Sequence, residues 1–293
     1  TTPGDGTGDI LRDAFIKTNS NTPDNVIVIK QASDFGTIDS NKQYFLAGNI
    51  DMGTTSIDLS GGKSISIRGA DFNVSGLFST SDNYTLFTGS DVGNVNIADI
   101  GIEISGANSK VYALTSSTGF QAIEVTRINY NNCTSLGYLD SFRQGLEIGT
   151  GRFGGKPSLE LRNVWLGGFR ITTSIVRNVD NTMTDPLFKA GTGFVMYSRF
   201  LTDINADLGT LAPLIDFSDS NFSNFNSLQL LGCIVARNGV INSEDTTIHP
   251  NITSGSSFSK WKQNVGLPNT YEGGQLSLTT ESVTTINAVD VFE

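Results

Sequence analysis

Ile97-Ala98-Asp99-Ile100-Gly101-Ile102 has apolar residues at its first, fourth and sixth positions. Segments with a similar spacing are Ile67/Ala70/Phe72, Val125/Ile128/Tyr130, Leu161/Val164/Leu166, Tyr197/Phe200/Thr202 and Leu230/Cys233/Val235. This spacing suits a strand, a tight bend and a second strand, with all three side chains directed to the core. The starts of these segments lie 30, 28, 36, 36 and 33 residues apart. A repeat of that length without helical signal predicts the stacked coils of a parallel β-solenoid.

We therefore expect an all-β fold, a right-handed parallel β-helix like the pectate-lyase solenoid, over residues 26–240 with a short helix before it. The runs at residues 26–29 and 44–50 are rich in β-formers and predict its first strands. A β-sandwich or jelly roll is the alternative, because it too has many short strands joined by turns. It gives no reason for the triplet to return at this interval.

The composition of the chain excludes several classes of partner. It has 293 residues, a net charge of -10 and no cluster of basic residues. This acidic composition argues against binding to nucleic acid. No apolar run reaches the roughly 18 residues that span a bilayer, so we expect no membrane insertion. Cys133 and Cys233 are too few for a disulfide framework and are predicted to be buried free thiols.

Residues 1–25 are predicted to form a flexible arm and a docking helix. Asp9 can cap the helix, whose apolar face is formed by Ile10, Leu11, Ala14 and Phe15. A helix of about eleven residues is marginal in water, so this face must dock on the body of the chain or on other copies. Residues 241–293 lose the repeat and are expected to form a C-terminal cap or connector.

Few residues suggest chemistry. Gly149-Thr-Gly-Arg-Phe-Gly154 matches a dinucleotide-binding pattern, but Lys156-Pro157 follows where a helix is required, so we predict a turn between coils and no cofactor. His249 is the one histidine and no nucleophile elbow is present, so we expect no catalytic triad. Residues 4–9 look like a calcium-binding repeat, but such sites need stacked copies and there is one, so we expect no metal site. Trp165 is predicted to lie in the core or a subunit contact, while Trp261 is the better candidate for stacking on a sugar.

Paired carboxylates remain the open route to catalysis, since glycoside hydrolysis needs two of them on one face. A solenoid could place such a pair on neighbouring coils, although the sequence selects no pair. The available carboxylates are Asp99, Glu103, Glu124, Glu147, Asp203, Asp207, Asp216 and Asp219.

The N-terminal residues 3–21 read Pro-Gly-Asp-Gly-Thr-Gly-Asp-Ile-Leu-Arg-Asp-Ala-Phe-Ile-Lys-Thr-Asn-Ser-Asn. This stretch resembles a segment that recurs in tail-fibre and other appendage proteins of tailed bacteriophages. The matching positions are Gly8, Asp9, Leu11, Arg12, Ala14, Phe15, Lys17, Asn19 and Asn21. Residues 44–51 and 264–274 also look like regions of phage fibre-like proteins.

The resemblance implies a homotrimeric virion protein that joins other virion proteins through its N-terminal segment. Three copies would also bury the apolar helix face and the apolar C-terminal tail. We therefore expect an extracellular appendage that binds host-surface polysaccharide. No catalytic signature of such proteins can be matched to residues of this chain, so a polysaccharide depolymerase on the same scaffold is the alternative.

Overall fold

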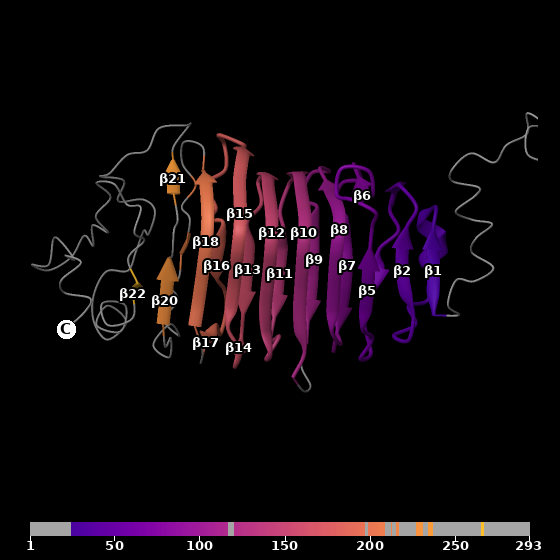
Figure 1. Ribbon diagram of the computed structural model, residues 1–293, viewed down its shortest axis with the longest axis horizontal. Helices are drawn as coiled ribbons and strands as arrows, with labels where there is room; N and C mark the ends of the chain where they lie inside the picture. The colour runs from indigo at the N-terminus through magenta and orange to yellow at the C-terminus, as the bar shows by residue number, and fades with distance from the viewer. Residues whose placement is uncertain are drawn as a thin grey trace, which may run out of the picture.

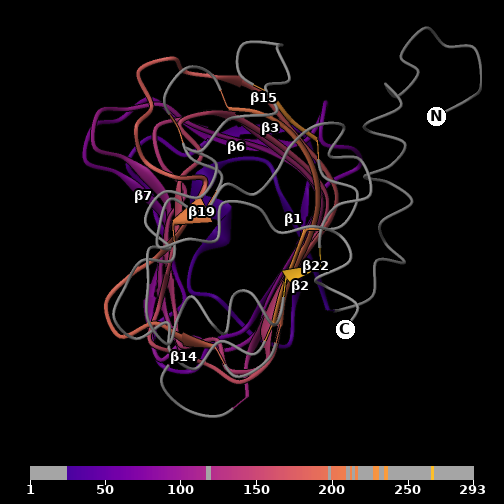
Figure 2. The same cartoon turned by 90° about the vertical axis from the view of Figure 1, so that its left-hand side faces the viewer.

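The chain folds into a parallel β-solenoid. The computed structural model describes residues 25–116, 120–196, 199–208, 212, 215–216, 227–230, 234–236 and 265–266. Strands lie side by side along the long axis (Figure 1), and the coils overlie one another when viewed along that axis (Figure 2). Every strand pairing given for the described residues is parallel, for example β10 (Ala122–Cys133) with its neighbours β8 (Val95–Ile104) and β12 (Gly145–Gly155). The predicted all-β parallel β-helix is confirmed, and the antiparallel sandwich and jelly roll are excluded.

Within the described residues, three sheets form the walls of the solenoid. The largest has 13 strands, which are β8, β10, β12, β1 (Val26–Ile29), β2 (Gln43–Leu46), β3 (Asn49–Asp51), β5 (Ile65–Arg68), β6 (Gly76–Ser79), β15 (Phe169–Val179), β18 (Arg199–Asp207), β20 (Ser227–Leu230), β21 (Ile234–Ala236) and β22 (Val265–Gly266). The second has β4 (Ile57–Asp58), β7 (Thr85–Ser90), β9 (Lys110–Thr115), β11 (Gly137–Asp140), β13 (Leu159–Arg162), β16 (Phe188–Ala190) and β19 (Ile215–Asp216). The third pairs β14 (Val164–Trp165) with β17 (Val195–Met196), and a short 3-10 helix, η2 (Ala32–Phe35), follows β1.

The strands expected near the N-terminus are present, as β1, β2 and β3. The docking helix with Ile10, Leu11, Ala14 and Phe15 lies outside the described residues. Within the segment predicted as a C-terminal cap, β22 pairs with β20 of the large sheet.

The predicted repeat is correct in its first registers. Ile67 pairs with Ile97 and Ile97 with Val125, so the first apolar position of three segments forms one column. The fourth and sixth positions of the second and third segments also pair, for example Ile102 with Tyr130. These side chains are all buried.

The sixth segment also keeps this register, because Leu230 pairs with Thr202 in the column of Val125 and Val235 pairs with Ala206 in the column of Tyr130. Tyr197 and Cys233 lie outside the described residues, and other members of the repeat were wrong. Ala70 and Phe72 lie in a loop, and Leu77 of β6 takes the place beside Ile102 that Phe72 was expected to fill. Leu161 lies in β13 of the second sheet, Val164 lies in β14 of the third, and Leu166 follows β14 and is 38% exposed.

The register of the later coils also differs from the predicted repeat. The true successors of Val125 are Ile148 and then Ile171, each 23 residues further on. Beyond them Phe200 pairs with Phe169 and Thr202 with Ile171, so the fifth predicted segment is out of register with the first three.

The glycine-rich segment 149–154 is not the predicted turn between coils. It lies inside β12, where Thr150 adopts a φ of 55° and bends the strand in its middle. Asp99 and Arg127 lie at the corresponding places in β8 and β10 and have φ values of 62° and 48°. Three stacked residues in the left-handed region therefore turn three successive strands at one corner of the solenoid.

Aromatic side chains stack through the core across successive coils. Phe87 packs on Tyr112 with ring centroids 5.5 Å apart, and Tyr130 packs on Phe153 at 5.3 Å. The Tyr112 and Tyr130 hydroxyls share a hydrogen bond of 2.8 Å. Burial raises the pKa of both hydroxyls, so they stay protonated.

Two single-residue predictions about the core are confirmed. Trp165 is fully buried and donates its indole N–H to the Arg162 carbonyl oxygen at 2.9 Å. Cys133 is a buried free thiol whose pKa burial raises to about 12, so it is unreactive at neutral pH. Cys233 lies outside the described residues.

Candidate functional site

A groove of about 280 Å³ lies on the outer face of the large sheet, where β6, β8 and β10 run side by side. Its floor contains the outward-facing partners Phe78 and Glu103, followed by Asn131 on the next strand. Residues 69–75, which connect β5 to β6, form one wall. The lining residues are Asn49, Phe72, Asn73, Gly76, Leu77, Phe78, Gly101, Ile102, Glu103, Asn129 and Asn131. We call this feature the lateral groove.

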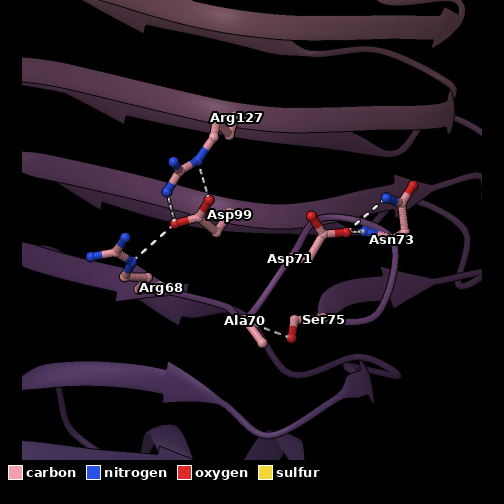
Figure 3. A network of polar contacts seen from close by, with 7 residues as sticks. All are labelled: Arg68, Ala70, Asp71, Asn73, Ser75, Asp99 and Arg127. Atoms are coloured by element: carbon pink, nitrogen blue, oxygen red, sulfur yellow. Dashed lines mark hydrogen bonds and ion pairs between the residues drawn. The ribbon is translucent and has the colours of Figure 1, made fainter.

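Internal hydrogen bonds shape the 69–75 loop (Figure 3). Asp71 Oδ1 accepts hydrogen bonds from the backbone N–H and side-chain amide of Asn73, at 2.9 and 2.7 Å. The Ser75 hydroxyl accepts one from the Ala70 N–H at 3.1 Å. These turns return the chain to the sheet at β6 after a short excursion.

A glycine in β8 lets this loop lie flat on the sheet. The Gly101 N–H donates to the Ser75 carbonyl oxygen at 2.8 Å. A Cβ at position 101 would lie only 2.9 Å from the Phe72 carbonyl oxygen, so any larger residue would push the loop away. Glycine at this position is therefore required by the close approach of the two backbones.

Two aromatic rings lie at the groove. The Arg152 guanidinium of β12 stacks on the Phe72 ring, with its carbon 4.7 Å from the ring centroid. This cation–π contact ties the loop to a distant coil and covers that ring face. Phe78 is 36% exposed, which is unusual for a large apolar side chain in a regular strand. Its ring is the apolar surface that the groove offers to a ligand.

The polar groups of the groove are amides and one carboxylate. Asn131 donates its side-chain N–H to Glu103 Oε2 at 3.0 Å, which orients the carboxylate. Asn49, Asn73 and Asn129 add groups that can both donate and accept hydrogen bonds. Such a lining suits a ligand rich in hydroxyl groups, with an apolar face for the ring.

An ion-pair network lies beside the groove at the corner of the solenoid (Figure 3). The Asp99 carboxylate accepts hydrogen bonds from Arg127 and, at 2.9 Å, from Arg68 Nε. Burial raises the pKa of Asp99, but the bonds from Arg127 and Arg68 outweigh this effect and hold the pKa below its usual value. Asp99 is therefore a structural anion at this corner and not a proton donor at neutral pH.

The carboxylates considered as catalytic candidates lie in different parts of the solenoid. Glu124 and Glu147 are register partners on β10 and β12 and line a second groove of about 310 Å³. Glu124 accepts a long hydrogen bond from Asn96 at 3.5 Å, and Glu147 forms an ion pair with Arg170 at 3.6 Å. Asp203 and Asp207 belong to β18 and Asp216 belongs to β19. None of these three lies on β8, β10 or β12, the strands that hold Asp99, Glu103, Glu124 and Glu147. Asp219, His249 and Trp261 lie outside the described residues.

Sequence reasoning missed the aromatic part of the lateral groove. Phe72 was assigned to the core because it completed an apolar triplet, and Phe78 was not singled out. The available signal was the polar, turn-rich segment around Phe72, which is untypical of a buried strand.

No family model, curated protein or solved structure matches the chain. Within the described part of the chain, no helix has the length and apolar character needed to cross a membrane. The same residues contain no cluster of three or more His, Cys, Asp or Glu side chains suited to a metal ion. The geometry of the grooves and the resemblance of residues 3–21 to phage appendage proteins are therefore the basis for a functional proposal.

Proposed function

We propose that the chain is a structural and receptor-binding component of a bacteriophage virion appendage, a tail fibre or spike, that adheres to host-surface glycans. The observation that carries the adhesive part is the lateral groove, where Phe78 lies beside Glu103, Asn131 and further amides. Ligand sites commonly combine apolar rings with a few placed polar groups. The N-terminal resemblance supports the virion part.

The same proposal includes an extracellular homotrimer. The N-terminal segment would join it to other virion proteins, leaving the solenoid free to meet the host surface. A long stack of coils suits this task, because it presents an extended lateral face on a rigid support.

The test follows purified protein on candidate host bacteria. Retention on cells and the release of reducing ends from their surface polysaccharide are measured together. Retention without release is the expected result. Absence of retention on every candidate strain tested would contradict the proposal.

A polysaccharide depolymerase is the second candidate, and the register pairing of Glu124 with Glu147 favours it. Parallel neighbours lie about 4.8 Å apart, so two such carboxylates can flank one glycosidic bond. Release of reducing ends that Glu124→Gln and Glu147→Gln each abolish would establish this activity. Release that survives both changes would exclude the pair.

A further inference from the structure

We propose that the lateral groove binds an uncharged glycan segment, laid across the coils along the solenoid axis. This inference rests on the proposed adhesive function and adds to it the chemical class and direction of the ligand. It depends on the extent of the groove, on the exposed ring of Phe78 and on the charge of its lining.

The extent of the groove defines the direction. Its lining residues come from four strands that are neighbours in the large sheet, β3, β6, β8 and β10. Neighbouring strands lie about 4.8 Å apart, so the floor extends about 14 Å along the axis. A ligand that fills it must be an extended chain of several units and not a single sugar ring.

Phe78 defines the apolar contact. One face of a pyranose ring exposes C–H bonds, and these pack on the negative face of an aromatic ring. Phe78 faces out of the sheet between its register partners Asp51 on β3 and Glu103 on β8, and Asn49 lies two residues before Asp51 on the same strand. Hydroxyls at the edge of a stacked sugar therefore reach polar groups on both sides.

The charge of the groove lining defines the chemical class of the glycan. Glu103 is the one charged side chain among the described residues that line the groove. Its carboxylate can accept two hydroxyl hydrogen bonds, while it would repel a uronate or phosphate group.

The nearby arginines do not reverse this preference. Arg68 and Arg127 share the Asp99 carboxylate, so these three groups keep one net positive charge, and the Arg152 guanidinium on the Phe72 ring keeps its own. Asp71 in the loop, which interacts electrostatically with Arg127, and Asp51 beside Phe78 add two negative charges, so that with Glu103 these groups stay net negative. A neutral sugar chain therefore fits the groove better than an acidic one.

The test uses surface polysaccharide from a bacterium that retains the protein. Anion exchange separates the extract into neutral and acidic fractions, and calorimetry measures the affinity of the full chain for each. Binding to the neutral fraction is expected to be at least tenfold tighter. Phe78→Leu keeps an apolar side chain but removes the ring, and Glu103→Gln removes the charge; each is expected to weaken binding by about tenfold.

Two variants serve as matched controls. Phe120→Ala removes an aromatic ring that is 69% exposed and lies outside the lining, and Asp185→Asn removes an exposed charge elsewhere. Both are expected to bind like the wild-type chain, and thermal melting verifies that all four variants fold.

The possible failures are distinguishable. Preference for the acidic fraction, or unchanged affinity in folded Phe78→Leu and Glu103→Gln, would overturn this inference and leave the adhesive function intact. Loss of all retention on bacteria would overturn both.

Discussion

The coil that runs from β5 to β8 is longer than the coil that runs from β10 to β12, and the difference accounts for the lateral groove. The chain takes 30 residues from Ile67 to its partner Ile97, whereas it takes 23 from Val125 to Ile148. The shorter coil contains little beyond its strands and tight corners. The longer coil contains more residues than its strands and corners need, and some of the additional residues form the loop that is one wall of the groove.

The position of the additional residues is visible in the register. Ten residues separate Ile67 from Leu77, but only five separate their partners Ile97 and Ile102. The five additional residues lie within the 69–75 loop, which leaves the sheet after β5 and returns at β6. Regular coils therefore provide stability, and the coil with an insertion provides the groove for which we propose glycan binding.

The largest expected effect distinguishes the two roles of phenylalanine. Phe153→Ala, in the core of a short coil, is expected to lower the free energy of unfolding by about 3–5 kcal/mol, because it leaves a cavity between Tyr130 and Phe188. Phe78→Ala, in the groove, is expected to change it by about 0.5 kcal/mol or less. Denaturant titration of both variants checks the contrast, and equal losses would contradict it.

A smaller effect is expected where the loop meets the sheet. Gly101→Ala places a Cβ against the Phe72 carbonyl and is expected to cost about 1–3 kcal/mol and to weaken glycan binding. The matched variant Gly149→Ala has its nearest atom at 3.5 Å and is expected to stay within about 0.5 kcal/mol of the wild type. A neutral Gly101→Ala that binds normally would show that the loop does not depend on this contact.

Within the core, the paired hydroxyls are expected to contribute jointly. Tyr112→Phe leaves the Tyr130 hydroxyl buried without this partner and is expected to cost about 1–2 kcal/mol. The double variant Tyr112→Phe/Tyr130→Phe removes both groups and is expected to recover part of that loss. A double-mutant cycle from urea unfolding measures the coupling, and strict additivity would contradict it.

The smallest effect is expected at the solenoid corner. Asp99→Asn keeps a residue that tolerates the left-handed φ but removes the charge, and a cost of about 1 kcal/mol is expected because the arginine partners are exposed.

The pH dependence of stability checks the same ion pairs. Since folding lowers the pKa of Asp99, its contribution is present above about pH 4, the pKa of an unfolded aspartate, and is lost as pH falls through the lower folded value. Unfolding measured from pH 6 to pH 2 should therefore show a smaller acid loss in Asp99→Asn than in the wild type. Parallel curves would show that the ion pairs contribute nothing.

The solenoid could be predicted from the sequence because strand columns repeat their apolar spacing, as Ile97 and Val125 do. The number of residues per coil could not, since loop length varies and the triplet that begins at Leu161 has the same spacing but runs from the second sheet into the third. The groove was hidden for a related reason. An apolar residue in an excursion, such as Phe72, satisfies the same local pattern as a core residue, and only the register of β6 with β8 distinguishes them.

The most direct measurement of the central claim is hydrogen–deuterium exchange of the full chain with and without the neutral polysaccharide fraction. We expect the ligand to slow exchange in the 69–75 loop and in the adjoining parts of β6, β8 and β10, and to leave β15 unchanged. Protection confined to the groove around Glu124 and Glu147, or none in the 69–75 loop, would show that the lateral groove does not bind the glycan.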